Sequence, residues 1–229
     1  MFIYNGGNSD AALEDILSSN SNENQITLCM MEELSNYLLQ ETHTDNTEHK
    51  HEYDEHIWLS LKCAKKLCLI ISEHLKLLDP NNADIYTQNT NSYIDKINTL
   101  DAAYESMIST AKTREVVIID RFPFRYLADD YSLICHSAFP GCSSETDAGF
   151  NTILQLADKL DTLGSYSAIT IEHSNVNIAD AVKEATKAKQ ISTYTMNSLQ
   201  TVTRDDIESG LTYLSAMESN LDTLKKVLN

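Results

Sequence analysis

Short apolar segments alternate with amphipathic helices in the second half of the chain, and this alternation constrains the fold most. Residues 116–120 and 168–172 form continuous apolar runs that are typical of buried strands. Helical patterns occupy 147–163, 177–189 and 204–228, and a further strand is expected at 191–196. Strands of this kind belong in a parallel sheet whose two faces are covered by helices. We therefore predict an α/β fold.

The first half carries a smaller set of elements followed by one very long helix. Short strands are expected at 2–4 and 26–29, a helix at 10–17, and helical periodicity at 32–39. Apolar positions in 60–78 share one helical face, and the Asp79–Asn82 segment ends that helix. A helical pattern then runs from Ala83 to about Ala111, which is roughly 40 Å at 1.5 Å per residue. A helix of this length is suited to joining two lobes.

We therefore expect two lobes whose parallel sheets are flanked by helices. The predicted parts are an N-terminal α/β lobe at 1–82 with a His- and acid-rich loop at 41–56, an interlobe helix at 83–112, and a C-terminal α/β lobe at 113–229. Residues 2–7 resemble the end of a buried strand, as if the chain began within a domain. We therefore expect the first lobe to be incomplete. Its exposed sheet edges would favour a homodimer.

The chain is strongly acidic, with 34 Asp and Glu against 17 Lys and Arg and a formal net charge of −17. This balance argues against nucleic acid or an anionic membrane as the main partner. It suits a surface that attracts cations, although solubility alone explains it equally well. No run approaches the roughly 20 apolar residues that span a bilayer. The first residues also lack a signal-peptide pattern.

His56 is the first candidate metal ligand. It ends a polar run of imidazoles and carboxylates, two residues before the only Trp and the start of an amphipathic helix. Imidazoles and carboxylates are common zinc ligands. Asp54 and Glu55 could orient the His56 ring as hydrogen-bond acceptors. A polar His that merely precedes a helix is an equally good interpretation.

Three further histidines, His43, His49 and His51, lie in the same polar run. Polar residues separate them and give them no fixed geometry, so we expect them to act as an auxiliary loop that captures metal weakly. A solvated linker without function is the alternative.

The ends of two predicted strands supply the remaining candidates. Asp120 ends the first apolar strand and Glu172 ends the second, and ligands of open α/β sheets bind beyond the carboxyl ends of strands. We predict both carboxylates as metal ligands. His173 has a similar position. For Arg121 we favour an ion pair with Asp120 that holds the loop, because an Arg cannot bind a cation.

An enzyme is not expected. The five cysteines form no Cys-x-x-Cys pair, and the chain lacks the common nucleophile, phosphate-loop and zinc-protease motifs. A thiol hydrolase using Cys135 or Cys142 with His173 is the remaining enzymatic alternative.

Several motifs resemble the solute-binding proteins of zinc and manganese ABC importers. Residues 2–7 (Phe-Ile-Tyr-Asn-Gly-Gly) look like the end of that family's strand, and 54–60 (Asp-Glu-His-Ile-Trp-Leu-Ser) look like its signature that carries a metal-binding His. A His- and acid-rich loop before that signature is typical of the zinc members. Residues 79–86 resemble the entry to the interlobe helix, and 100–104 match that helix further along. The resemblance covers essentially the whole chain.

The resemblance implies two lobes that hold Zn²⁺, or alternatively Mn²⁺, in the cleft between them and deliver it to a membrane ABC permease. It also implies an extracytoplasmic location, as a cell-surface lipoprotein or a periplasmic protein. His56 is the ligand that carries over from the family.

The chain departs from the family at three ligand positions. It has no counterpart of an early His, and the second-lobe His motif is replaced by the Asp-Arg-Phe-Pro-Phe-Arg-Tyr segment at 120–126. The last ligand position falls near Asn197 to Gln200, and neither residue is a strong zinc ligand. A related subgroup shares this segment and a Gly-Cys-Ser-x-Glu-Thr loop, as at 141–146. These departures motivate an alternative function, a surface interaction protein resembling an adhesin whose metal site has decayed.

Overall fold

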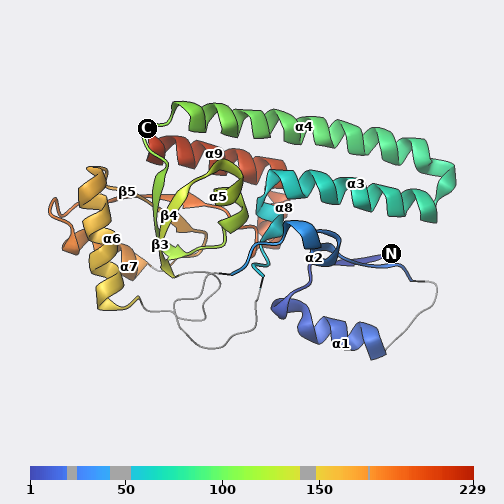
Figure 1. The fold of residues 1–229 in the computed structure, drawn as a ribbon, viewed down its shortest axis with the longest axis horizontal. Helices are drawn as coiled ribbons and strands as arrows, with labels where there is room; N and C mark the ends of the chain where they lie inside the picture. The colour runs from blue at the N-terminus through green and yellow to red at the C-terminus, as the bar shows by residue number, and fades with distance from the viewer. Residues whose placement is uncertain (20–24, 42–52, 140–147, 175) are drawn as a thin grey trace. The chain divides into compact units, whose positions relative to one another are not determined.

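A computed structural model describes residues 1–19, 25–41, 53–139, 148–174 and 176–229 (Figure 1). The chain divides into two compact units, and the division falls inside helix α4 (Ala83–Thr110), between Asp101 and Ala102. Each unit contains a parallel sheet flanked by helices, which confirms the predicted fold class. Across the described ranges, we find no helix with the length and apolar character needed to cross a membrane.

Unit 2 is built on a four-stranded sheet with the order β4-β3-β5-β6, and every neighbouring pair is parallel. The strands are β3 (Glu115–Arg121), β4 (Ile134–Phe139), β5 (Ser167–Ile171) and β6 (Ser192–Met196). The helices that accompany them are α5 (Arg125–Tyr131), α6 (Phe150–Leu163), α7 (Val176–Ala185), α8 (Arg204–Glu208) and α9 (Tyr213–Leu228).

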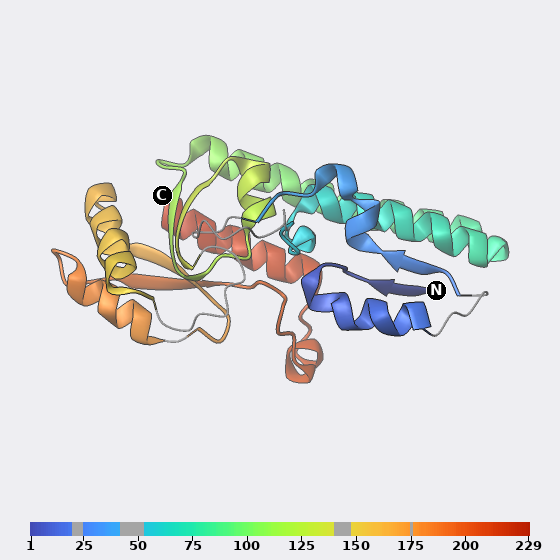
Figure 2. The same ribbon diagram turned by 60° about the horizontal axis from the view of Figure 1, so that its bottom comes forward.

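Helices cover both faces of this sheet, as its apolar strands predict. Val117 and Ile119 of β3 pack with Leu160 of α6 and Val182 of α7 in one buried cluster. Helix α9 contacts β3, β5 and β6, and it lies apart from the α6–α7 pair in Figure 2. Burial of apolar surface on both faces stabilises the sheet by about 25 cal/mol per Å².

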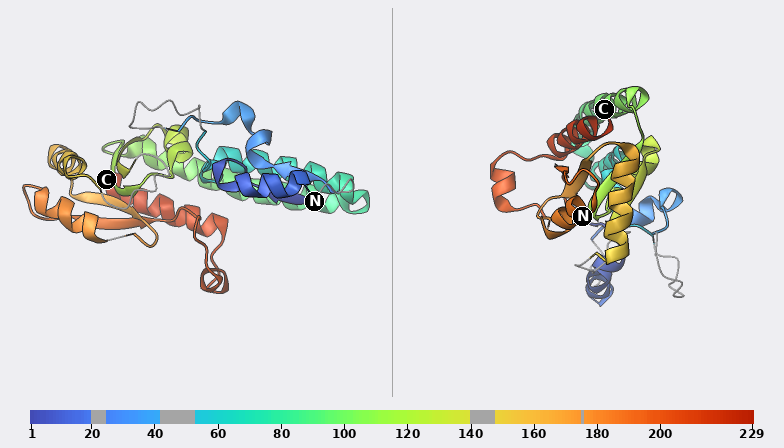
Figure 3. Two further views of the ribbon diagram at one scale, coloured as in Figure 1. Left: turned by 90° about the horizontal axis from the view of Figure 1, so that it is seen from below. Right: turned by 90° about the vertical axis from the view of Figure 1, so that its left-hand side faces the viewer.

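Unit 1 has a two-stranded parallel sheet of β1 (Phe2–Tyr4) and β2 (Thr27–Cys29). Around it lie η1 (Asn8–Asp10), α1 (Ala11–Ser19), α2 (Met30–Glu33), η2 (Ser35–Tyr37), η3 (Ile57–Leu59), α3 (Leu61–Leu78), η4 (Pro80–Asn82) and the first part of α4. The Ser60 hydroxyl accepts a hydrogen bond from the Cys63 amide and caps α3. Helix α3 and the first part of α4 run side by side as a helical hairpin in Figure 1, and they overlap when seen from below in the left view of Figure 3.

The helix predicted from Ala83 to about Ala111 is confirmed, but two other helix predictions are wrong in detail. The expected helix at 204–228 is broken into α8 and α9 at Gly210, whose φ of 89° is unsuitable for a helix. Thr203 and Thr212 each form a capping box, so both helices begin independently. The expected periodicity at 32–39 gives only the short α2 and η2.

The turn after β1 packs closely against residue 55. The Asn5 side-chain amide donates a hydrogen bond to the Glu55 backbone carbonyl at 2.9 Å, and the Ser9 backbone amide donates one to the Glu55 carboxylate at 3.0 Å. Gly7 lies between them with φ of 88° and ψ of −171°, a backbone conformation that is almost restricted to glycine. A Cβ atom on Gly7 would lie 2.6 Å from a Glu55 carboxylate oxygen. The Asn-Gly-Gly segment therefore fixes the segment that carries His56.

We predict that Gly7→Ala lowers the free energy of unfolding by about 2 kcal/mol or more, because it adds a clash to a conformation that costs 1–3 kcal/mol. The control is Gly164→Ala, where φ is 62° and nothing lies within 4 Å of the added Cβ. We expect the control to cost about 1 kcal/mol. Urea unfolding followed by circular dichroism measures both variants. An equal loss of unfolding free energy in the two variants would contradict the structural role of the Gly7–Glu55 contact.

Candidate metal-binding site

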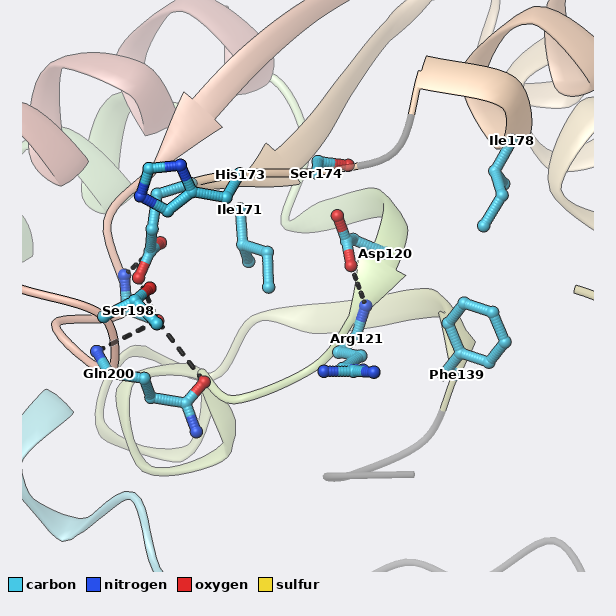
Figure 4. Close-up of a pocket in the computed structure, with 11 residues that line it drawn as sticks. Asp120, Arg121, Phe139, Ile171, His173, Ser174, Ile178, Ser198 and Gln200 are labelled. Atoms are coloured by element: carbon cyan, nitrogen blue, oxygen red, sulfur yellow. Dashed lines mark hydrogen bonds between the residues drawn. The ribbon is translucent and has the colours of Figure 1, made fainter. Parts of the chain in front are cut away.

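A pocket of about 300 Å³ lies in unit 2, at the carboxyl ends of its parallel strands (Figure 4). Strand β3 contributes Asp120 and Arg121, and the segment after β5 contributes Glu172, His173 and Ser174. The turn after β6 adds Ser198, Gln200 and Thr201, while apolar walls come from Phe139, Ile171 and Ile178. The fold therefore brings together two of the predicted ligands, Asp120 and Glu172, from strands that are adjacent in the sheet.

Asp120 has one carboxylate oxygen available for a ligand. Its Oδ1 atom accepts a hydrogen bond from the Arg121 amide at 2.7 Å. Its Oδ2 atom is buried and accepts no hydrogen bond from any residue that the structure describes. A buried carboxylate oxygen without a donor is energetically costly, and a bound cation would compensate that cost. Asp120 is therefore well suited to act as a metal ligand.

Glu172 already has a structural partner. Its Oε2 atom accepts a hydrogen bond from the Ser198 amide at 2.8 Å, and its Oε1 atom accepts one from the Ser198 hydroxyl. These bonds join the end of β5 to the turn after β6. A metal could bind the remaining lone pairs of the carboxylate. Glu172 is therefore a weaker candidate than Asp120, and its role as a ligand stays a prediction.

The predicted ion pair between Arg121 and Asp120 is wrong for the residues that the structure describes. The bond between them runs from the Arg121 backbone amide, and the ion pairs of the described chain do not include the Arg121 guanidinium. The pairing register of β3 and β4 shifts between Ile118 and Arg121, as in a β-bulge. Bulges redirect side chains near functional sites, and here two consecutive residues both line the pocket.

His56 is held by a carboxylate in unit 1. Asp54 Oδ1 accepts a hydrogen bond from the His56 amide at 2.9 Å and lies 2.9 Å from His56 Nδ1. Both residues are at most 3% exposed, and the Trp58 ring lies 5.3 Å from the imidazole. A carboxylate at Nδ1 favours the tautomer with its proton on Nδ1 and its lone pair on Nε2. This is the arrangement that orients a histidine for metal binding through Nε2.

The segment after β6, where the family's last ligand was expected, forms a fixed turn. The Asn197 side-chain oxygen accepts from the Leu199 amide at 2.8 Å, and the Asn197 backbone amide donates to Asn220 Oδ1 at 2.7 Å. Asn220 also donates to the Asn197 carbonyl at 2.8 Å. Asn197 thus shapes the turn, which places Ser198 and Gln200 at the pocket. The role of Ser198 has no signal in the sequence, because it depends on Glu172, 26 residues earlier.

The described residues do not form a complete protein site for a metal. No group of three or more His, Cys, Asp and Glu side chains in them is arranged to hold an ion. The proposed loop histidines His43, His49 and His51 lie outside the described residues, as do Cys142 and the 141–146 loop. Among the described residues, the donors that fit zinc chemistry are the oriented imidazole of His56, the buried and unpartnered oxygen of Asp120, and the Glu172 and His173 side chains that line the pocket.

Comparison with known proteins identifies the family. The profile of the family described as "Zinc-uptake complex component A periplasmic" (ZnuA) matches residues 1–227. The chain belongs to this family. Zinc-binding lipoprotein AdcA of Streptococcus pneumoniae is 31% identical over 179 residues, covering 78% of this chain and 34% of AdcA. High-affinity zinc uptake system protein ZnuA of Bacillus subtilis is 29% identical over 182 residues, covering 78% of this chain and 54% of that protein.

Two solved structures share the fold of this chain. Zn(II)-bound AdcA from S. pneumoniae has a TM-score of 0.76 and 26% identity, covering 99% of this chain and 46% of that one. The metal-dependent lipoprotein YcdH from B. subtilis has a TM-score of 0.78 and 23% identity, covering 100% and 80%. This chain thus spans about a third of AdcA and about half of B. subtilis ZnuA.

Cys135 lacks the properties of a catalytic nucleophile. Burial raises the pKa of its thiol from 9.0 to about 12, so the thiolate is scarce at neutral pH. The neighbouring His136 ring instead lies 2.8 Å from the Glu115 carboxylate. The structure therefore gives no support to a thiol hydrolase that uses Cys135.

We predict that iodoacetamide at pH 8 labels Cys135 roughly a thousandfold more slowly in the folded protein than in urea, because the thiolate fraction falls by about that factor. Peptide mapping by mass spectrometry measures labelling at Cys135 separately from the other cysteines. Rapid labelling of Cys135 in the folded protein would support the thiol-hydrolase alternative.

Proposed function

We propose that this protein captures Zn²⁺ outside the cytoplasm as the solute-binding component of an ABC importer and delivers the ion to a membrane permease. Zinc is the cargo and undergoes no chemical change. The proposal is supported by membership of the zinc-uptake family and by relatives whose names describe zinc binding and zinc uptake. We propose an extracytoplasmic location on the same grounds, because these relatives include a lipoprotein and a zinc uptake protein.

The observation that carries the proposal is the contact between Asp54 and His56. A buried carboxylate fixes the imidazole in the tautomer that binds a metal through Nε2. A His that merely preceded a helix would not need this buried partner. We propose His56 and Asp120 as zinc ligands, with Glu172 as a further ligand or as the group that orients the turn at Ser198. The loop histidines keep their predicted auxiliary role.

Zinc is a better match than manganese for these donors. Imidazole nitrogen binds Zn²⁺ well, whereas Mn²⁺ prefers sites made of carboxylate, carbonyl and water oxygen. A site with one well-oriented imidazole therefore favours zinc. Manganese remains the alternative ion, and competition between the two metals in one titration would separate them.

We predict that His56→Ala weakens zinc binding by at least about a hundredfold and that Asp54→Asn weakens it by about 10- to 100-fold, the usual effect of removing the group that orients a ligand. The matched control is His136→Ala, which removes another histidine paired with a carboxylate, at 2.8 Å from Glu115. Isothermal titration calorimetry with zinc chloride measures all three variants. Unchanged affinity in His56→Ala would exclude His56 as a ligand.

A surface interaction protein with a decayed metal site is the second candidate. Two observations favour it: the described residues lack a cluster of three metal-binding side chains, and Asn197 forms a structural turn where the family's last ligand was expected. The same calorimetry separates the candidates, because a decayed site predicts no measurable zinc binding in the wild-type protein. The predicted homodimer has no support in the comparisons and stays a prediction.

A further inference from the structure

We infer that the pocket at the strand ends of unit 2 takes zinc as a complex with a small α-amino acid, whose carboxylate binds Arg121 while the metal binds Asp120. This inference rests on the proposed zinc function and extends it to the chemical form of the cargo. It follows from three features of the pocket: a cation with no ion-pair partner among the described residues, an open carboxylate oxygen, and a volume that exceeds the needs of a bare ion.

The first feature is the positive charge of Arg121. A guanidinium is ionised at every physiological pH, so it repels Zn²⁺ at close range. None of the ion pairs among the described residues neutralises it. In Figure 4 its guanidinium and the Asp120 carboxylate point away from each other from the end of β3. A guanidinium in this position does not strengthen the binding of a bare cation. A guanidinium does suit a carboxylate, which it binds through two parallel hydrogen bonds.

The second feature is Asp120, which supplies the opposite charge to the same pocket. Its buried Oδ2 atom has no donor among the described residues, and a bound cation would compensate for the missing donor. Glu172 is less available because both of its oxygens accept hydrogen bonds from Ser198. The pocket thus presents one site for a cation and one for an anion. A ligand that carries both charges satisfies the two sites together.

The third feature is size and lining. A volume of about 300 Å³ lies at the lower end of the range for small-molecule pockets, which is about 300–1,000 Å³. A bare ion is far smaller, whereas an amino acid chelated to zinc matches this volume. The side chains of Phe139, Ile171 and Ile178 form an apolar part of the wall. That part suits the side chain of the amino acid, and an imidazole would fit both the wall and the metal.

The chemistry of such a complex is balanced. The α-ammonium group loses a proton to water, and its nitrogen then binds zinc together with one carboxylate oxygen. The second carboxylate oxygen remains available to the Arg121 guanidinium. The amino acid supplies two or three donors, which would compensate for the small number of protein ligands in the described residues. No bond in the amino acid is broken, and the metal is not oxidised or reduced.

Equilibrium dialysis with ¹⁴C-labelled L-histidine and ⁶⁵Zn tests this inference on the full chain. We expect the wild-type protein to retain one labelled histidine with each zinc ion, and to retain less than about a tenth as much histidine without zinc. Arg121→Gln should lower histidine retention at least about tenfold, since it loses a charge-assisted contact. Labelled histamine, which lacks the carboxylate, should not be retained at the level of histidine.

Two variants serve as controls. Arg204→Gln removes an equal charge from an exposed residue of α8 and should leave histidine retention within about twofold of wild type. Arg121→Lys keeps the charge without the planar guanidinium, and its retention should lie between wild type and Arg121→Gln. Circular dichroism of each variant verifies that it is folded. If Arg121→Gln does not fold, the Arg121→Lys and histamine results decide the question.

The outcomes separate this inference from the function on which it rests. If both ligands are supplied and the protein retains zinc but no labelled histidine, or if histidine retention is equal in Arg121→Gln and wild type, the inference is overturned and zinc capture is left in place. Equal retention of histamine and histidine would exclude a carboxylate contact and overturn it as well. Failure to retain zinc with or without histidine would overturn both proposals.

Discussion

The parallel pairing of β4, β3, β5 and β6 determines where this protein can carry polar chemistry. Both faces of that sheet are covered by helices, and its central strands are apolar along most of their length. Because all four strands run in one direction, their carboxyl ends lie along a single edge. Asp120, Glu172 and Ser198 come from three different strand ends and are brought to one pocket by this constraint. A change in strand order or direction would separate them.

Carboxylates in this chain have two distinct roles, and their hydrogen bonds distinguish the roles. Asp54 and Glu172 each bind a specific partner and hold it in place: the His56 imidazole and the Ser198 turn. Asp120 keeps one buried oxygen without a donor among the described residues. The first kind of carboxylate gives the structure its geometry. The second kind retains binding capacity, which is why it is the stronger candidate for direct contact with an ion.

The sequence predicts the elements whose pattern is local and strong. The apolar strands at 116–120 and 168–172 and the long helix from Ala83 have clear periodicities, and all three are present. The position of Asp120 and Glu172 at one edge also follows from strand direction alone. Both inferences use only the order of residues and the geometry of regular structure.

Features that depend on distant contacts could not be predicted in this way. The break at Gly210 is a different case, because its signals, a glycine between two capping boxes, are local but are outweighed in the sequence by a helical pattern that continues to Leu228. The irregular register at the end of β3 is set by its partner β4, so the orientation of Arg121 was not visible from sequence. Ser198 matters only because Glu172 lies beside it. The cases of Arg121 and Ser198 both involve residues far apart in the chain.

The most direct test of zinc capture is an anomalous difference map, measured at the zinc edge from crystals of the zinc-loaded protein. We predict a peak about 2.0–2.2 Å from His56 Nε2 or from a carboxylate oxygen of Asp120, the usual distances for zinc ligands. A peak bound by other side chains, with His56 and Asp120 both outside its coordination shell, would contradict zinc capture by these residues.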